Sequence, residues 1–184
     1  MGAPRWAVVD VETSGLDLER DRVVSIAALA VDDDGIIADS VVSLLDPGVP
    51  PGPTDLHGIT AEMLTGWPRF GEIAVRLAGL LRGRVLVAHY ADFDFRFLMD
   101  EFRRTPVPCP VEALMCTVEL SRRLGLPVRD HKLSTLARYW RVPQARPHDA
   151  FDDARVLAAI LARSLKRAQD RGMALPVRAV CVER

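Results

Sequence analysis

The hydrophobic positions in the first quarter of the chain form short runs that are separated by turn signals. Residues 6–13 and 23–32 are rich in β-branched and other apolar side chains, which is typical of strands. An Asp-Asp-Gly turn signal follows at residues 33–35, and residues 36–46 continue as a third strand candidate. We therefore predict a hairpin or meander of three strands at the beginning of the fold.

A change of period near residue 60 marks the start of a helix-rich part. The segment 47–55 before it contains four prolines and two glycines, which predicts a surface loop. Beyond it, apolar spacing and stop signals predict helices over 60–65, 70–82, 92–104, 118–125, 132–140 and 150–170, and strands over 85–89 and 113–118. The order of these elements predicts an α/β fold with a mixed sheet of about five strands.

The length and composition fit one compact, soluble domain. Of the 184 residues, 49% are hydrophobic and 27% are charged, which is enough apolar material for a core without disulfides or a structural metal. We place one domain at residues 1–171 and leave 172–184 as a C-terminal tail of unknown role. The cysteines form no CxxC pair, and no signal peptide or bilayer-spanning apolar run is present. We expect a cytoplasmic protein that does not contact membranes.

The net charge of −1 conceals an asymmetry along the chain. Residues 1–64 carry 12 acidic and 3 basic side chains, a net charge of −9, whereas residues 65–184 carry 13 acidic and 21 basic ones, a net charge of +8. An acidic part that holds cations and a basic part that holds phosphates would suit a metal-dependent enzyme acting on nucleic acid. From charge alone, ordinary solvated surfaces are the preferred explanation.

Two carboxylates two residues apart, Asp10 and Glu12, lie in the first predicted strand. Side chains at that spacing point to the same face of a strand. Their valine neighbours indicate a buried strand, where two unpaired anions side by side are costly unless a divalent cation binds them. The Asp-x-Glu pattern is common, however, and solvated acids at a strand end explain it equally well.

A second pair of acids, Asp92 and Asp94, follows the predicted strand 85–89 at the start of a helix. Carboxylates are favoured there by the helix dipole and as caps, and Asp92 fits the capping role. Asp94 lies between two phenylalanines, which indicates a partly sequestered position. Since a second cap would be redundant, Asp94 is a candidate for another role.

The third cluster is the sequence His-Asp-Ala-Phe-Asp-Asp at residues 148–153. Asp149 fits the N-cap of the long helix, with Asp152 as a partner resembling a capping box. Asp153 instead shares a helical stripe with the leucines that should face the sheet, so it needs a partner such as a metal ion. His148 precedes the cap in a loop, where a lone histidine is usually a surface residue.

Four carboxylates from separate segments form an oxygen-rich ligand set, which suits Mg²⁺ or Mn²⁺ rather than zinc. Two such ions can stabilise both the attacking and the leaving oxygen when a phosphodiester is hydrolysed. A histidine that titrates near neutral pH can deprotonate the water. The candidate metal ligands are therefore Asp10, Glu12, Asp94 and Asp153, and His148 is the candidate general base.

Three segments carry a family resemblance, and they occur in the order of the family's motifs. The sequence VVDVETSGL resembles the first motif of the DEDDh 3′–5′ exonucleases, LVAHYADFDFRFL the second and HDAFDDA the third. HGIT at residues 57–60 and HKLSTLARYW at 131–140 also resemble stretches that recur in this family, and the match covers about residues 6–165. Within the family, the chain is most similar to the proofreading epsilon subunit of bacterial DNA polymerase III and its stand-alone relatives.

The resemblance implies an RNase H-like fold, with a mixed five-stranded sheet that has one antiparallel strand and is flanked by helices. It also implies the four ligands and the base given above, two bound Mg²⁺ or Mn²⁺ ions, and release of nucleoside 5′-monophosphates from a 3′ end. Residues that match positions contacting the terminal nucleotide are Thr13, Ser14, Gly15, Leu16 and His57. One departure is Tyr90, where the family usually has Asn; this leaves the substrate preference open.

The sequence is compatible with three functional hypotheses. The leading one is a 3′–5′ exonuclease that acts on single-stranded DNA ends in proofreading or repair, and an alternative is an exoribonuclease that trims RNA. A third, from another class, is a catalytically weak module that binds partners within a polymerase assembly. DNA polymerase subunits are possible partners, although no segment of the sequence indicates them.

Overall fold

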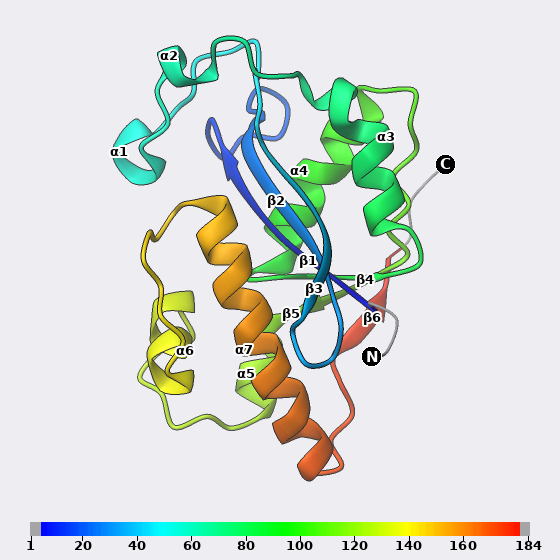
Figure 1. Ribbon diagram of the computed structural model, residues 1–184, viewed down its shortest axis with the longest axis vertical. Helices are drawn as coiled ribbons and strands as arrows, with labels where there is room; N and C mark the ends of the chain where they lie inside the picture. The colour runs from blue at the N-terminus through cyan, green and yellow to red at the C-terminus, as the bar shows by residue number, and fades with distance from the viewer. Residues whose placement is uncertain (1–4, 181–184) are drawn as a thin grey trace.

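The computed structural model describes residues 5–180 of the chain and is built on a six-stranded sheet with the order β3-β2-β1-β4-β5-β6 (Figure 1). The strands are β1 (Trp6–Thr13), β2 (Val23–Val31), β3 (Ile37–Leu44), β4 (Val85–Ala88), β5 (Ala113–Cys116) and β6 (Val177–Ala179). β1 pairs in parallel with β4, and β4 with β5, whereas the β1–β2, β2–β3 and β5–β6 pairs are antiparallel. The predicted mixed α/β sheet is confirmed, but two strands rather than the expected one, β2 and β6, run against β1, β3, β4 and β5.

The predicted number of five strands is wrong by one, because residues 177–179 add β6 to the edge of the sheet beside β5. This strand has only three residues, all of them exposed, so neither length nor apolar alternation marks it in the sequence. It lies within the segment 172–184, where the sequence suggested no role. The boundary of the domain at residue 171 stays a prediction.

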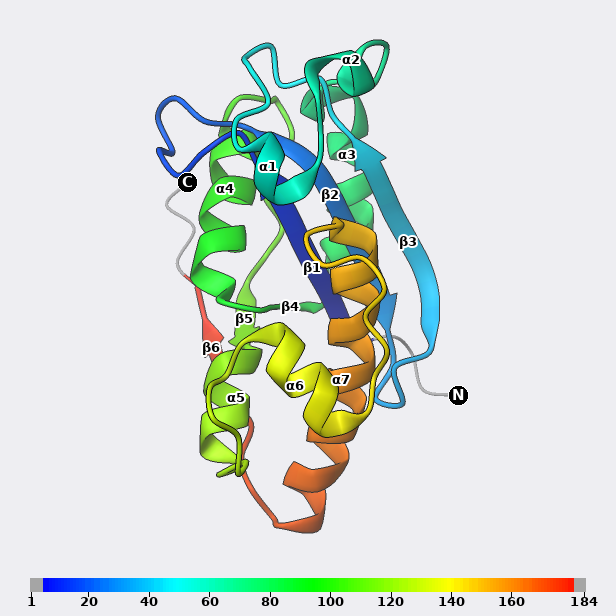
Figure 2. The ribbon, with the colours of Figure 1, turned by 90° about the vertical axis from the view of Figure 1, so that its left-hand side faces the viewer.

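Helices cover both faces of the sheet (Figures 1 and 2). α3 (Phe70–Leu81) and α4 (Ala91–Arg103) share one core with the sheet, while α5 (Thr117–Arg123), α6 (Leu133–Trp140) and α7 (Ala150–Asp170) share the other. Two short helices, α1 (Thr54–His57) and α2 (Ala61–Leu64), lie between β3 and α3. The long predicted helices are confirmed. The short helix α1 was not predicted: it begins at Thr54, inside the expected surface loop, and Gly58 ends it in a left-handed conformation.

The alternation of β1 explains how the sheet prepares a site at its end. Ala7, Val9 and Val11 pack in the core on the α3 and α4 side. Trp6 and Val8 pack on the α7 side. Since side chains alternate along a strand, Asp10 and Glu12 continue the second face at the point where its apolar residues stop.

A buried ion pair holds the end of the β1–β2 connection against α4. The guanidinium of Arg22 donates to both oxygens of Glu101, with Nε–Oε1 and Nη2–Oε2 distances of 2.7 and 2.6 Å. The backbone N–H of Val23 donates to the same carboxylate at 3.1 Å. The Glu101 side chain is 1% exposed, so these three bonds satisfy a carboxylate that would otherwise be costly to bury.

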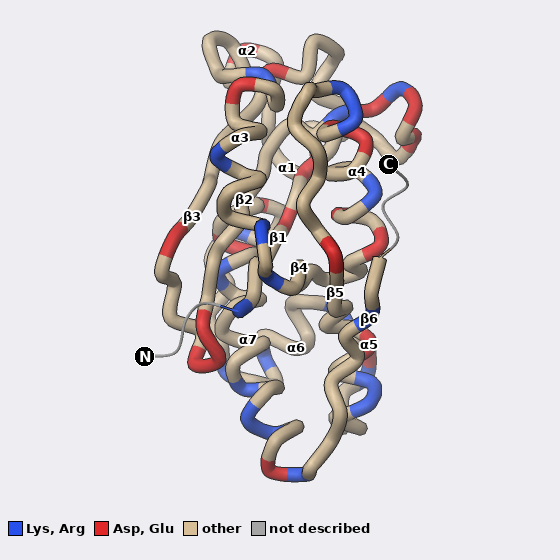
Figure 3. The backbone as a smooth tube through the Cα atoms, turned by 90° about the vertical axis from the view of Figure 1, so that its right-hand side faces the viewer, with Lys and Arg blue, Asp and Glu red and all other residues tan. Residues whose placement is uncertain are grey.

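Charged residues are distributed unevenly over the fold, as the sequence indicated. Figure 3 shows basic positions along the C-terminal half of α7, where Arg163, Lys166 and Arg167 lie, and acidic positions in the β2–β3 turn at residues 32–34. Among residues 5–180 no helix is both long enough and apolar enough to span a membrane. The cytoplasmic location stays a prediction.

Candidate active site

A cavity of about 560 Å³ opens where the C-terminal end of β1 meets the first turns of α4, α6 and α7. All five residues singled out in the sequence as ligands or base line this cavity: Asp10, Glu12, Asp94, His148 and Asp153. They come from β1, α4, α7 and the loop before α7, which are separated by up to about 140 residues along the chain. The fold therefore brings the three acidic segments together, while the chemical role of each residue stays a prediction.

Asp94 is held in place by the backbone of β1. The parallel pairing of β1 with β4 stops at Val8 and Val87, so the β4-facing edge of β1 is free beyond that point. The first turn of α4 lies there, and Asp94 Oδ1 accepts a 3.2 Å hydrogen bond from the N–H of Val11. Because Val11 separates Asp10 from Glu12, this bond places the Asp94 carboxyl beside both.

Asp153 is fixed from two sides at the start of α7. Its Oδ1 accepts a 2.6 Å bond from the Gln144 side-chain amide, and its Oδ2 accepts a 3.0 Å bond from the backbone N–H of His148. One ligand atom each of Glu12, His148 and Asp153 lie within 4.8 Å of one another. His148 has a positive φ of 65° and an exposed side chain, so its ring can reach into the cavity from the loop.

The neighbouring acids have the partners expected of a helix start, with two corrections. Asp149 is the N-cap of α7 and accepts from the N–H of Asp152, as predicted. Asp152 does not complete a capping box, because its carboxylate accepts from the N–H groups of Ala145 and Arg146 and thereby fixes the preceding loop. The capping interpretation of Asp92 is also wrong, since Tyr90 occupies the N-cap of α4 and Asp92 forms an ion pair with Arg178 of β6.

The carboxyl cluster carries more negative charge than its surroundings stabilise. Burial and the neighbouring carboxylates Asp94 and Glu12 raise the pKa of Asp10 well above its ordinary value. Burial, followed by repulsion from Asp153 and Asp94, raises the pKa of Glu12 to about 8. Burial also raises the pKa of Asp94 to about 8, against the opposing hydrogen bond from Val11. Cations are needed to keep these groups ionised near neutral pH.

The donor set fits divalent cations of the oxygen-preferring kind. Four carboxyls and the imidazoles of His89 and His148 line the cavity, and no thiol lines it within the described residues. Burial raises the pKa of Asp153 as well, although bonds from Gln144 and His148 oppose the shift. Magnesium and manganese ions are bound by such clusters and restore the charged form of each carboxyl.

Comparison with known proteins agrees with this geometry. A family model described as an exonuclease matches residues 7–161. The chain belongs to the exonuclease family. It is 35% identical over 154 residues to the DNA polymerase III subunit epsilon of Treponema pallidum, an alignment that covers 82% of this chain and 72% of that protein.

Two further comparisons extend the match. The chain is 30% identical over 170 residues to the PolC-type DNA polymerase III of Caldanaerobacter subterraneus, which covers 91% of this chain but only 12% of that relative. A solved structure of exonuclease X in complex with 5′ overhanging duplex DNA is similar with a TM-score of 0.69 and 26% identity, covering 92% of this chain and 95% of that one. The RNase H-like fold of these exonucleases is therefore confirmed for this chain.

The residues expected to contact the terminal nucleotide lie beside the cavity of this exonuclease domain rather than in its lining. Thr13 and Ser14 are buried at the end of β1, where the Ser14 hydroxyl donates to Asp21 Oδ1 at 3.0 Å. A Cβ at Gly15 would overlap the Asp21 carboxylate, so a larger residue there would displace the side chain that binds Ser14. Leu16 is 82% exposed at the tip of the loop.

His57 ends α1 and contributes to the same side of the domain. Its Nδ1 accepts a 3.0 Å bond from the N–H of Ile59, so one ring nitrogen is used to hold the loop after α1. Partial burial lowers the pKa of His57, and the charge of His148 acts in the same direction. Contact of His57 with a nucleotide stays a prediction.

Several residues that line the cavity were missed in the sequence. Gln144 binds Asp153 from a loop without any motif, and Lys132, Leu133 and Ser134 come from the start of α6. His89, at the end of β4, was not assigned a role; burial lowers its pKa to about 4, so it is neutral, and its Nδ1 lies 2.9 Å from Thr117 Oγ1. No local spacing signal marks Gln144 or residues 132–134 as cavity residues, because their approach depends on how α6 packs on α7.

Proposed function

We propose that this exonuclease domain is a metal-dependent 3′–5′ exonuclease that removes nucleoside 5′-monophosphates from single-stranded DNA ends. The observation that carries the proposal is the convergence of Asp10, Glu12, Asp94 and Asp153 on one cavity, with raised pKa values that only bound cations would offset. The four carboxyls would hold two Mg²⁺ or Mn²⁺ ions. When bound, such ions supply positive charge to the scissile phosphate and to the attacking and leaving oxygens.

The protein side chains have separate tasks in this reaction. The imidazole of His148 accepts the proton of the attacking water, and the loop that carries it is tied to Asp153 through the 3.0 Å N–H bond. Gln144 keeps the Asp153 carboxyl in one orientation through the 2.6 Å bond. The leaving group is the 3′-oxygen of the shortened strand. The terminal nucleotide would lie between the β1–β2 loop, at Thr13 to Leu16, and His57.

DNA is the favoured substrate because of the relatives that the chain matches. One relative is named as a subunit of DNA polymerase III and another as a PolC-type DNA polymerase III, and the exonuclease X structure contains DNA. RNA is the alternative and requires the same bond to be broken next to a 2′-hydroxyl. Association with polymerase subunits is a second proposal, and a catalytically weak binding module is disfavoured because all five candidate residues line one cavity.

A product and polarity assay tests the proposal. Matched single-stranded DNA and RNA oligomers, labelled at either end, are incubated with the protein and Mg²⁺ or Mn²⁺, with and without chelator. We expect a descending ladder from 5′-labelled DNA, nucleoside 5′-monophosphates as products, and no cleavage with chelator. The variants Asp10→Asn and Asp153→Asn should be inactive, and Asp55→Asn on α1 serves as the matched control. Digestion by the Asp10 and Asp153 variants at the wild-type rate would refute the role of the carboxyl cluster. A clear preference for RNA would refute DNA as the substrate.

A further inference from the structure

One basic side chain stands out among the acids of the candidate active site. Of the described residues that line the cavity, Lys132 is the one lysine or arginine. It is exposed, and no side-chain hydrogen bond or ion pair within 4.0 Å is formed by its ammonium group in residues 5–180, although its charge attracts the nearby Asp130 carboxylate. It lies at the N-cap position of α6, and its backbone N–H is already bound to Asp130 Oδ1 at 3.1 Å. An exposed cation that lines the same cavity as four carboxyls is suited to hold a phosphate of the substrate strand.

Tyr90 lines the same cavity in an unfavourable backbone conformation. Its φ and ψ of 66° and 48° fall in the left-handed region, which is costly for a bulky residue. Its side chain is nevertheless 54% exposed, and its ring contacts His89 edge to face at a centroid distance of 5.2 Å. Because more than half of the Tyr90 side chain is exposed and it lies outside the hydrophobic core, core packing does not explain the strain. An exposed aromatic face next to a nuclease site is suited to stack on a base or sugar.

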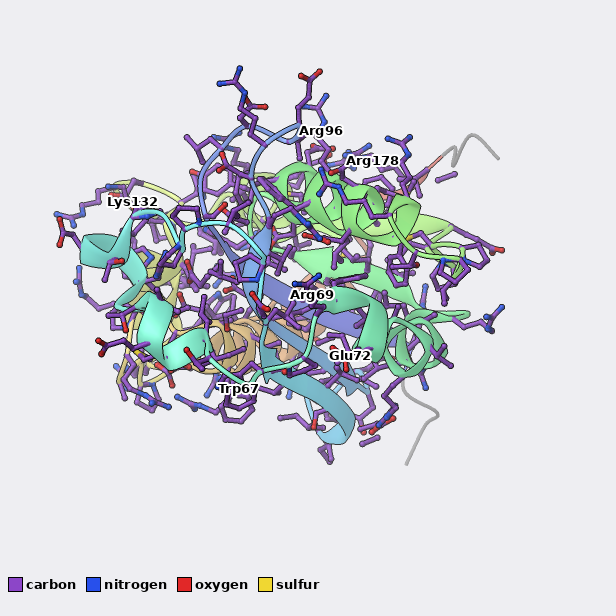
Figure 4. The ribbon with its side chains drawn as sticks, turned by 90° about the horizontal axis from the view of Figure 1, so that it is seen from above. Trp67, Arg69, Glu72, Arg96, Lys132 and Arg178 are labelled. Carbon is purple, nitrogen blue, oxygen red and sulfur yellow. The ribbon has the colours of Figure 1, made fainter. Side chains whose placement is uncertain are left out.

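The position of α6 determines which nucleotide these residues would meet. In Figures 1 and 2, α1 and α6 lie at opposite ends of the face on which β1, α4 and α7 converge. Figure 4, seen from above, places Lys132 at the α6 side of the domain, well away from Arg69 and Trp67 of the α3 side. If the terminal nucleotide lies towards α1, the strand that precedes it leaves the cavity towards α6.

We propose that Lys132 and Tyr90 form the subsite for the nucleotide that precedes the scissile bond, with Lys132 on its 5′-phosphate and Tyr90 against its base or sugar. This inference rests on the proposed exonuclease function. The subsite orders the part of the strand that stays after cleavage, so its main effect is on binding and on the position of the leaving 3′-oxygen. It distinguishes a polynucleotide end from a free mononucleotide ester.

Kinetics with two substrates test the subsite. The p-nitrophenyl ester of thymidine 5′-monophosphate carries a scissile phosphate but no preceding nucleotide, whereas an oligothymidylate carries both. For Lys132→Gln we expect kcat/KM on the oligothymidylate to fall roughly 5- to 20-fold, mainly through KM, and its salt dependence to weaken by about one phosphate contact. For Tyr90→Asn we expect kcat/KM on the oligothymidylate to fall roughly 5- to 100-fold. Both variants should hydrolyse the ester at the wild-type rate.

Matched controls separate a subsite from general charge effects. Lys132→Arg should recover most of the oligothymidylate activity. Lys166→Gln removes the other lysine of the sequence, which is exposed on the C-terminal half of α7, and should change neither substrate. If Lys132→Gln slows the ester as much as the oligomer, or slows neither, the assignment is wrong.

Binding is tested without turnover by methyl resonances. Reductive ¹³C-methylation of the protein gives one signal for Lys132 and one for Lys166, because these are the two lysines of the chain, together with the α-amino signal. In Mg²⁺, a tetrathymidylate with a phosphorothioate at its terminal linkage should shift the Lys132 signal and leave that of Lys166 unchanged. Thymidine 5′-monophosphate alone should shift neither. This readout does not depend on turnover. If the wild type hydrolyses no substrate, the proposed function fails. If the Lys132 signal does not shift, the subsite assignment fails separately.

Discussion

Replacing one carboxyl of the cluster should stabilise the metal-free protein at alkaline pH. Glu12→Gln keeps the size of the side chain but removes a negative charge from the cavity. In the wild type, burial and the repulsion of Asp153 and Asp94 raise the pKa of Glu12 from 4.5 to about 8. A carboxyl whose pKa is raised in the folded state contributes stability that is fully present below pH 4.5, the pKa of the unfolded chain. This contribution decreases as the pH rises and is lost once the pH passes about 8.

The size of the effect follows from the same pKa difference. A tenfold change in proton affinity corresponds to about 1.4 kcal/mol, so the change from 4.5 to about 8 has a ceiling of roughly 5 kcal/mol. Water in the open cavity screens the charges, and four carboxyls share the available protons. Between pH 5.5 and 8.5 we therefore expect the free energy of unfolding to fall by about 2–3 kcal/mol less in Glu12→Gln than in the wild type.

Urea unfolding in the presence of chelator measures this difference. The free energy of unfolding is determined at pH 5.5, 7.0 and 8.5 for the wild type, Glu12→Gln and the control Glu62→Gln, whose side chain is exposed on α2. The wild type and the control should lose stability as the pH rises, and Glu12→Gln should lose less. Addition of Mg²⁺ should restore the wild type at pH 8.5. A metal-free wild type that gains stability over this range would refute the electrostatic reasoning.

Three further predictions address other parts of the molecule. His148→Gln should lower kcat by about 10²–10⁴-fold while Mn²⁺ binding is retained, and loss of metal binding in a calorimetric titration would contradict its role as base. Glu101→Ala should lower the free energy of unfolding by about 3–5 kcal/mol, because it leaves the partly buried Arg22 guanidinium unpaired; urea unfolding checks this, with the exposed Glu19→Ala as control. Tyr90→Asn should raise stability by about 1 kcal/mol in the same assay, since Asn tolerates the left-handed conformation, and a loss of stability would show that the ring supports the fold.

The sequence predicted the elements of the fold better than their edges. The long helices and the first three strands carry strong apolar periodicity over many residues, so α7 and β1 were found nearly in full. β6 was missed because three exposed residues make a strand only when β5 is beside them. The short helix α1 depends in the same way on Gly58 and on a proline-rich loop whose path no local pattern determines.

The same distinction applies to the candidate site. Asp10 and Glu12 were predicted from strand alternation, and Asp153 from the buried stripe of α7 on which it lies. Asp94 and His148 depended on resemblance, because Asp92 competes with Asp94 locally and a loop histidine has no pattern of its own. Gln144 and Lys132 could not be found from spacing, since each reaches the cavity through tertiary packing of α6 and α7.

Calorimetric titration of the metal-free protein with Mn²⁺ tests the central claim most directly, because the claim is that this carboxyl cluster is a two-metal site. The account predicts saturable binding of two ions per chain to the wild type near neutral pH, with proton release as the carboxyls with raised pKa values ionise. Asp10→Asn should lose most of this binding, and Asp55→Asn should retain it. Absence of binding to the wild type, or equal binding to Asp10→Asn, would contradict the account.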